Sequence, residues 1–271
     1  MRRLIVYGTG GLCNRLRPMA SAIELAERFD RELLIFWNNE PSCTVPFQDL
    51  FDDTQWNCIN ANEFRALGYD YSLPVLMPEV KKYQREMSIK YSWDNIERKM
   101  LTSCQENVLY MSNDFDPPYE QQSRRNLRMF FHPRPEIASR IQYIAEDLGI
   151  DKKTVGIHAR GCDMSGVSYA WYKEQAKRYY YFSDHKLFLA TEDEEYAKQF
   201  QKDFPGILTA PDTIYARKQQ PGEWKRNLNM VKESMVHSVI DLFLLAHTNI
   251  QVAWPHSTFA KVARIIGEKY D

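Results

Sequence analysis

The segment from Val155 to Asp163, VGIHARGCD, combines the residue types best suited to chemistry. Its apolar start predicts a buried strand, and side-chain alternation along a strand puts His158 and Arg160 on the same side. A guanidinium at a strand end can bind a pyrophosphate through paired hydrogen bonds and stays charged at every relevant pH. Such a cation would offset the charge that grows on a departing diphosphate. A loop salt bridge between Arg160 and Asp163 is the structural alternative.

The segment from Gly10 to Arg17, GGLCNRLR, is a glycine turn that runs into a predicted helix. Free backbone N–H groups at a helix start favour an anion or a sugar hydroxyl. The dinucleotide-binding spacing G-x-G-x-x-G is absent, because Cys13 stands within the segment. In the structural alternative, Asn14 caps the helix and the arginines are solvated.

Two further segments place polar groups at the ends of predicted elements. The run from Phe188 to Glu195, FLATEDEE, is a strand entering an acidic helix start, where one carboxylate could reach a sugar or ribose hydroxyl. Asp241 stands in an apolar helix and needs a partner, either a backbone cap or the N–H edge of a guanine base. Residues 256–259, HSTF, lie between a strand and a helix, and Ser257 there could be a cap or part of an anion site.

Two other chemistries have weaker support. Asp114 and Asp116 could form the D-x-D metal motif of a metal-dependent transferase, although the prolines that follow favour a turn. Cys162 beside His158 could be a nucleophile, but no third group orients the pair.

Alternating strands and helices must position these residues. A strand at 4–7, a helix at 14–29 and a strand at 33–37 predict a βαβ unit with a parallel sheet. The pattern weakens over 38–107, and a strand is predicted at 108–111. After the proline-flanked joint at 133–135, strands are predicted at 154–158, 186–190 and 250–253, and helices at 137–148, 194–204, 230–246 and 257–269.

Composition restricts the partners of the protein. A formal net charge of −1 argues against long-range attraction to nucleic acid or anionic membranes. Five widely spaced cysteines fit neither a disulfide framework nor a zinc site. No segment approaches the ~20 apolar residues of a membrane helix, and the first apolar run stops at Gly8. We therefore expect a soluble, cytoplasmic protein.

Taken in order, the four segments resemble the superfamily of α1,2-, α1,6- and protein O-fucosyltransferases, including the bacterial nodulation fucosyltransferases. Those enzymes share a glycine turn followed by N-R/Q, a strand end H-x-R-x-x-D, an acidic strand end, and a D-L…S-T/S-F block. The resemblance implies a GT-B-type α/β fold of two Rossmann-like domains whose parallel sheets face a central cleft. Residues 1–134 would form the acceptor side, and residues 135–271 would bind the nucleotide sugar. It also implies an inverting transfer from GDP-fucose to a glycan or protein hydroxyl, without metal or other cofactor.

The resemblance also assigns residue roles. Arg160 would stabilise the β-phosphate, His158 would approach the nucleotide, and Asp241 would accept hydrogen bonds from the guanine edge. The remaining donor-binding residues would be Asp193, His256, Ser257, Thr258 and Phe259. The opposite wall, near the fucose or the acceptor, would contain Gly11, Asn14 and Arg15.

Two departures from the family pattern keep alternatives open. Cys13 replaces a usual glycine, and Ser168 stands where some relatives have a glutamate as candidate base. Asp163 and Glu174 remain as candidate bases. A non-catalytic nucleotide-sugar or glycan-binding protein is therefore one alternative, and a metal-dependent transferase of another nucleotide sugar, using Asp114 and Asp116, is the second.

Overall fold

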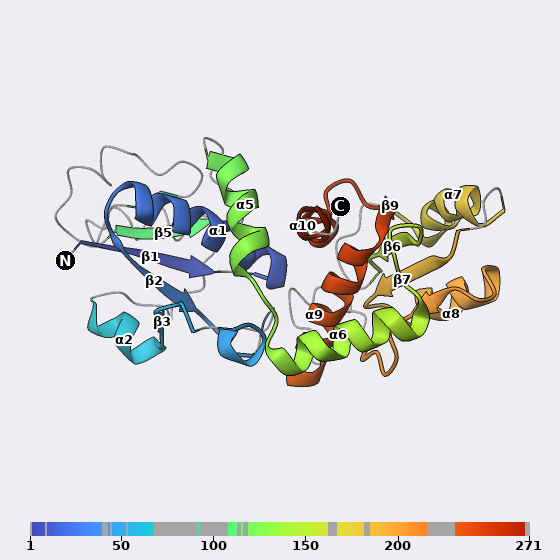
Figure 1. Ribbon diagram of the computed structural model, residues 1–271, viewed down its shortest axis with the longest axis horizontal. Coiled ribbons are helices and arrows are strands. Elements are labelled where there is room, and N and C mark those ends of the chain that lie inside the picture. The colour runs from blue at the N-terminus through green and yellow to red at the C-terminus, as the bar shows by residue number, and fades with distance from the viewer. Residues whose placement is uncertain are drawn as a thin grey trace. The chain divides into compact units, whose positions relative to one another are not determined.

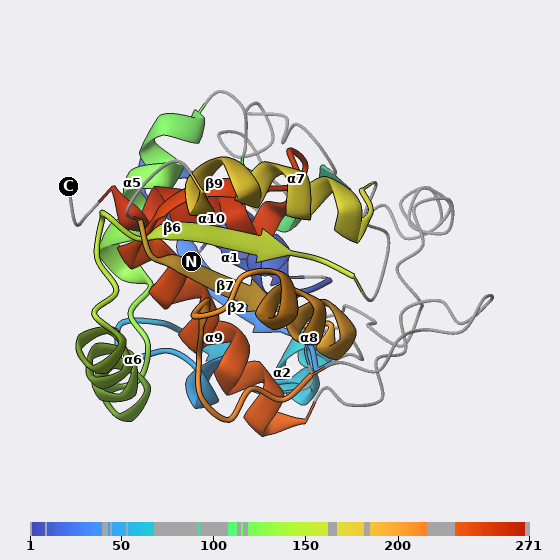
Figure 2. The same ribbon diagram turned by 90° about the vertical axis from the view of Figure 1, so that its right-hand side faces the viewer.

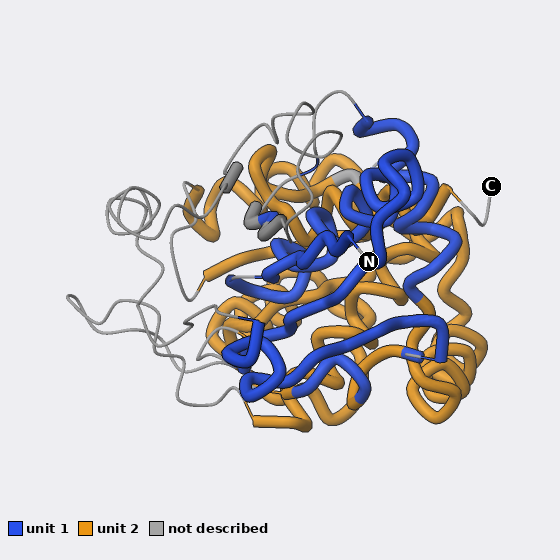
Figure 3. Tube along the Cα trace, turned by 90° about the vertical axis from the view of Figure 1, so that its left-hand side faces the viewer, with its two compact units in different colours: residues 1–39, 46–48, 52–131 blue, residues 40–45, 49–51, 132–271 orange. Residues whose placement is uncertain are grey.

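The computed structural model describes residues 2–8, 10–39, 43, 45–52, 54–67, 91–92, 108–112, 115, 119–161, 167–181, 185–215 and 231–268. The chain divides into two compact units, which are coloured separately in Figure 3. Unit 1 comprises Met1–Asn39, Pro46–Gln48 and Asp52–Phe131, and unit 2 comprises Glu40–Val45, Asp49–Phe51 and His132–Asp271.

Unit 1 is built on a parallel sheet with the strand order β3-β2-β1-β5-β4. The central strand β1 has the apolar sequence RLIVYG, and Leu4, Ile5 and Val6 are fully buried in it. A strand covered on both faces needs such a continuous apolar run. The strands are β1 (Arg3–Gly8), β2 (Glu32–Trp37), β3 (Cys58–Ile59), β4 (Tyr91–Ser92) and β5 (Val108–Ser112).

Helices cover both faces of this sheet (Figure 1). Helices α1 (Leu12–Arg28) and α5 (Glu120–Phe130) lie on one side, and α2 (Ala61–Ala66) lies on the other. The contact between α1 and α5 is partly polar, since Ser21 Oγ donates to Ser123 Oγ at 2.9 Å. On the opposite face the Phe36 and Phe64 rings stack with their centroids 4.0 Å apart. A short 3-10 helix, η1 (Phe47–Asp49), follows β2.

Unit 2 contains a second parallel sheet, with the strand order β8-β7-β6-β9. Its strands are β6 (Val155–Ala159), β7 (Leu187–Thr191), β8 (Leu208–Thr209) and β9 (Asn249–Ala253). Helices α7 (Tyr169–Tyr180) and α8 (Glu194–Asp203) lie on one side of it. Helices α9 (Lys232–His247) and α10 (Thr258–Gly267) lie on the other, as Figures 1 and 2 show, and α6 (Pro135–Leu148) packs against α9.

Successive side chains of β6 point to opposite faces of the sheet. Val155, Ile157 and Ala159 belong to the apolar cluster that includes Tyr172 of α7. Gly156 faces the other way, and a Cβ atom there would meet the Thr248 side chain after α9. The next even residue, His158, therefore points to the α9 and α10 side.

Local sequence signals explain where several helices begin and end. Pro135 is the first residue of α6, where its missing N–H costs nothing, and Gly149 ends the helix with φ of +60°. Helix α1 begins at Leu12, and its N-cap Gly11 makes no side-chain cap bond. The structural alternative in which Asn14 caps this helix is therefore wrong, because Asn14 already lies inside the first turn.

Within the described part of the chain, no helix combines the length and the apolar character required to span a membrane.

Candidate functional site

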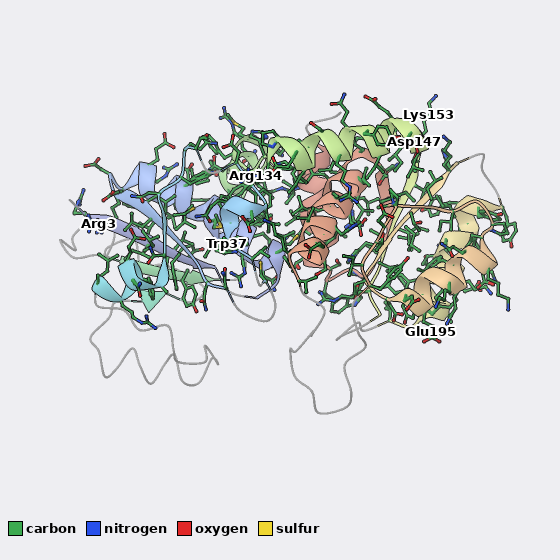
Figure 4. The ribbon with its side chains drawn as sticks, turned by 90° about the horizontal axis from the view of Figure 1, so that it is seen from below. Arg3, Trp37, Arg134, Asp147, Lys153 and Glu195 are labelled. Atoms are coloured by element: carbon green, nitrogen blue, oxygen red, sulfur yellow. The ribbon has the colours of Figure 1, made fainter. Side chains whose placement is uncertain are left out.

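The carboxyl edge of the unit 2 sheet gathers most of the polar residues that the sequence singled out. Figure 4 distinguishes the two edges of this sheet by their labels. Lys153, just before β6, lies at one edge, and Glu195, in the first turn of α8 after β7, lies at the other. Because β6, β7 and β9 are parallel, their C-terminal residues and the helix starts that follow share this second edge.

His158 ends up neutral and fixed in orientation at this edge. Its Nδ1 lies 3.0 Å from Ser257 Oγ, and the same Oγ accepts a hydrogen bond from Ala260 N at 3.1 Å. In the tautomer in which the Ser257 hydroxyl donates to Nδ1, the neutral ring carries its proton on Nε2. The Phe259 ring stacks on the imidazole at 4.8 Å. Burial, followed by the charges of Arg160 and of a second arginine on α10, lowers the pKa of His158 to about 3.

The start of α10 is organised for an anion. Ser257 is buried and is the N-cap, and the first turn of the helix carries no acidic side chain. Helix N-termini carry a partial positive charge, which this turn leaves unneutralised by side chains. Thr258, the first helical residue, is half-buried, whereas His256 is exposed and its ring contacts Trp254 edge-on at 5.4 Å. The HSTF segment thus combines a structural cap with groups that a ligand can reach.

Arg160 follows β6 directly and is half-buried. By strand alternation it continues on the side of His158, and its charge contributes to the lowered pKa of that ring. Its backbone N–H donates to Tyr172 Oη at 3.3 Å, and the next N–H, that of Gly161, donates to Glu192 Oε1 at 3.2 Å. The backbone that carries the guanidinium is therefore held by residues from two other elements.

Position 161 has no room for a side chain, so a glycine is needed there. Its φ is not in the left-handed region, which only Gly10, Gly149 and Gly206 enter among the described glycines. A Cβ atom on Gly161 would lie 2.8 Å from both Cβ and Cγ of Asp193. Real Cβ atoms essentially never come this close to another heavy atom, so the end of β6 can approach β7 only with glycine here.

Asp193, which we expected at the donor site, caps α8 through one oxygen of its carboxylate. Its Oδ1 accepts hydrogen bonds from Glu195 N at 2.9 Å and from Tyr196 N at 3.1 Å, and the residue is buried. This geometry is that of an N-cap carboxylate. Its contribution to the site is to hold the start of α8 against Gly161.

Asp241 is a buried carboxyl group on α9. Burial, together with the smaller effect of the nearby Glu192 charge, raises the pKa of this carboxyl group to about 8. No hydrogen bond of this carboxyl group is found among the described residues. The group is therefore mostly protonated at neutral pH, and a ligand that offers two N–H donors would stabilise the ionised form. The phenol of Tyr215 is also near, since the Asp241 charge contributes to its raised pKa.

In unit 1, the side chain of Arg15 binds the main chain of the turn that follows β1. We expected its guanidinium on the wall of the site, but the side chain is fully buried. Its Nε donates to Gly10 O at 2.7 Å, its Nη1 donates to Asn38 O, and its guanidinium lies over the Trp37 ring at 4.8 Å. Paired with main-chain carbonyls in this way, the guanidinium fastens the turn to the end of β2.

Asn14 and Gly11 are placed differently from Arg15. Asn14 is half-buried, and Arg17 Nη2 donates to its Oδ1 at 3.2 Å, which directs the amide donors away from Arg17. Gly11 has open space around its Cα, since a Cβ there would meet nothing within 4 Å. These two residues of the turn remain accessible to a ligand.

The other sequence-based candidates divide into two groups. Glu174 lies on an exposed part of α7, and Lys177 Nζ donates to its Oε1 at 2.6 Å. An exposed, lysine-bound carboxylate is a poor general base. Outside the described residues lie Asp163, Cys162, Asp114 and Asp116. Within the described ranges, no group of three or more His, Cys, Asp or Glu residues is arranged to hold a metal ion.

From the sequence, Tyr172 could stack on a sugar ring or pack in a core, with no role for its hydroxyl group, and Tyr215 was not singled out. Tyr172 lies in a run of aromatic residues, and such a run signals a core rather than a hydroxyl group aimed at a backbone N–H. Tyr215 follows β8, a strand of two residues that leaves almost no pattern in the sequence. Only the fold brings either hydroxyl to the carboxyl edge.

Comparison with known proteins gives a result for structure but not for sequence. No family model and no curated protein matches the chain. Fucosyltransferase NodZ from Bradyrhizobium superposes with a TM-score of 0.65 at 19% identity, over 97% of this chain and 92% of that chain. A variant of FUT1 from Arabidopsis thaliana in complex with GDP gives 0.59 at 14% identity, over 98% and 69%. POFUT1 in complex with GDP-fucose gives 0.53 at 13% identity, over 97% and 94%.

The chain has the fold of these fucosyltransferases.

The match confirms the predicted α/β class, of GT-B type with parallel sheets, and it confirms at the level of fold the resemblance seen in the ordered motifs. The fucosyltransferase fold extends over both units, because the matched structures cover nearly the whole chain.

Proposed function

We propose that the protein transfers fucose from GDP-fucose to a hydroxyl group of a glycan or protein. The observation that carries the proposal is the carboxyl edge of unit 2. Neutral His158 is bonded there to Ser257 at the start of α10 and is within reach of the Arg160 charge. The buried Asp241 is near Glu192, which accepts a hydrogen bond from Gly161 N beside Arg160. This edge belongs to a fold shared with fucosyltransferases crystallised with GDP or GDP-fucose.

Asp241 is proposed to recognise guanine. Guanine presents two adjacent N–H donors on one edge, and a carboxylate can accept both. Uracil and cytosine lack this pair, so they would leave the buried acid without its partners. Guanine binding would lower the pKa of Asp241 from about 8 and release a proton.

The diphosphate is proposed to lie against Arg160 and the start of α10. The guanidinium supplies charge and paired donors, and the first turn of α10 supplies backbone N–H groups and the Thr258 hydroxyl. His158 adds a neutral Nε2–H donor, whose direction is fixed by the bond between Nδ1 and Ser257. Phe259 keeps the imidazole in place by stacking on it.

The proposed reaction is an inverting displacement without a metal. The acceptor oxygen attacks the anomeric carbon, the bond from that carbon to the β-phosphate oxygen breaks, and the electron pair moves onto the phosphate. Arg160 stabilises the charge that develops there. The acceptor proton passes to a base, for which Asp163 is the candidate that remains. The accessible residues Gly11 and Asn14 are proposed to bind a sugar hydroxyl.

A thermal-shift panel of GDP, UDP, CDP and their sugars tests the donor class. A ligand at about 100 times its Kd adds about 2.7 kcal/mol to stability, which raises the melting temperature by several degrees. We expect this rise with GDP and GDP-fucose and not with the pyrimidine nucleotides. Equal rises with all three diphosphates, or a rise with UDP alone, would contradict the assignment of Asp241 to guanine. Release of GDP from GDP-fucose, above the uncatalysed rate, then tests the reaction.

A further inference from the structure

The backbone of the Arg160–Gly161 turn is held by two successive hydrogen bonds. Arg160 N donates to Tyr172 Oη at 3.3 Å, and Gly161 N donates to Glu192 Oε1 at 3.2 Å. The two acceptors come from different parts of the chain, helix α7 and the residue that follows β7. Together they fix the peptide groups on both sides of the Arg160 Cα, from which the guanidinium projects.

Tyr172 is held in place mainly by the packing of its side chain. Its side chain is completely buried, and it belongs to the apolar cluster that contains Ile157 and Ala159 of β6. The Trp171 ring meets its ring edge-on at 5.2 Å, and the Tyr196 ring does so at 6.2 Å. Within the described chain, the bond from Arg160 N is the one hydrogen bond that its hydroxyl makes. A phenylalanine would fill the same space, so packing alone does not account for the hydroxyl group.

The hydroxyl group reaches Arg160 from the side of the sheet opposite to the polar residues of the site. Ala159 faces α7 and its cluster, whereas His158 faces α10, where it meets Ser257 and Phe259. Alternation places the Arg160 side chain with His158. Tyr172 can therefore hold the Arg160 backbone without occupying the space in which a ligand would bind.

We propose that Tyr172 is a positioning residue, whose hydroxyl group holds the Arg160 backbone so that the guanidinium meets the departing diphosphate. The inference rests on the proposed function, because it acts through the role given there to Arg160. Glu192 accepts a hydrogen bond from the N–H of the adjacent peptide. Because Gly161 has no side chain, the turn can lie close against Asp193. Without the Tyr172 hydroxyl, the hydrogen bond from Arg160 N to Tyr172 Oη is lost, and the arginine samples a wider range of positions.

The test is the steady-state kinetics of Tyr172→Phe with GDP-fucose. A displacement of about 1 Å at a group that acts in the transition state costs roughly 10- to 100-fold in rate. We expect kcat to fall in that range while KM for GDP-fucose stays within about twofold, which is the pattern of an interaction used in the transition state.

Tyr169→Phe is the matched control. Tyr169 lies on the same helix, and its hydroxyl group donates to Asp203 at 2.7 Å, away from Arg160. This control should keep kcat near the wild-type value and should melt at a temperature close to that of Tyr172→Phe. In the Arg160→Ala background, Tyr172→Phe should cause no further loss, because the two residues act through one group.

Several outcomes would overturn the inference. They are wild-type kcat in Tyr172→Phe, an equal loss of kcat in Tyr169→Phe, an additive loss in the Arg160→Ala background, or a melting temperature of Tyr172→Phe far below that of the control. Failure of the proposed function looks different. In that case the wild-type protein does not turn over GDP-fucose, or Arg160→Ala is as active as wild type.

Discussion

GDP should bind more tightly as the pH rises towards 8, because Asp241 must lose a proton to accept the guanine N–H groups. With a pKa of about 8 in the ligand-free protein, roughly nine-tenths of the molecules carry this proton at pH 7. Each further unit of pH below 8 adds about 1.4 kcal/mol to the cost of ionising the group, so Kd should rise about tenfold per unit.

Titration calorimetry measures this coupling directly. GDP binding at pH 7, measured in two buffers with different ionisation enthalpies, should release about 0.9 proton per site. The range of pH 7–9 is suitable because the terminal phosphate of a nucleotide, with a pKa near 6 like other phosphate monoesters, is already largely ionised there. Asp241→Asn should bind GDP more weakly and abolish the proton release. Wild-type affinity in Asp241→Asn, or no proton release by the wild type at pH 7, would refute the reasoning.

The same raised pKa predicts a stability difference in the absence of ligand. The folded pKa of Asp241 is about 8, against an ordinary pKa of 3.8 for this side chain. Between these values the folded state holds a proton that the unfolded state lacks, so the contribution of Asp241 to stability falls as the pH rises. From pH 5 to pH 7, Asp241→Asn should therefore gain about 2–3 kcal/mol relative to wild type. Denaturant unfolding at both pH values measures this change, and a constant difference would contradict it.

Three further substitutions test the geometry of the site. Gly161→Ala should lower the melting temperature and abolish turnover, because the new Cβ would collide with Asp193. Gly11→Ala is the control. It should keep the wild-type melting temperature, since its Cβ meets no atom within 4 Å. Equal melting temperatures of the two variants would count against the space argument. Ser257→Ala should cost about 1–2 kcal/mol in urea unfolding, because the α10 cap and the partner of the imidazole are lost together, and an unchanged midpoint would show that neither bond matters.

The apolar strands of the fold were predictable from the sequence. The run from Leu4 to Tyr7 and the run from Thr154 to His158 both predicted strands, and the structure confirms them as β1 and β6 with small changes at the ends. Strands buried on both faces need continuous apolar residues, and this requirement is visible in the sequence without any knowledge of neighbours.

Two helices were missed for physical reasons. In α5 the buried positions include Ser123 and Asn126, which bond to Ser21 and to the Ala20 carbonyl of α1, so a polar contact replaced the expected apolar stripe. In α7 aromatic residues stand on several sides of the helix, and the buried face of Tyr172 and Ala176 does not stand out from them.

The sequence predicted which elements bear the site residues better than it predicted what each residue does. His158 and Ser257 were both placed at element ends, but the bond between them joins residues 99 positions apart in the chain. Two other features depend on distances between separate segments: the bond from the buried Arg15 guanidinium to Asn38, and the close approach of Gly161 to Asp193. No local pattern carries such distances.

The most direct test of the central claim is the rate of GDP release from GDP-fucose by Arg160→Ala. Removing one group that stabilises charge in a transition state costs about 10²–10³-fold in turnover, and we expect a loss of this size. Arg178→Ala is the control, since Arg178 is exposed in the last turn of α7, and it should keep the wild-type rate. Turnover by Arg160→Ala within a few fold of wild type would contradict the account.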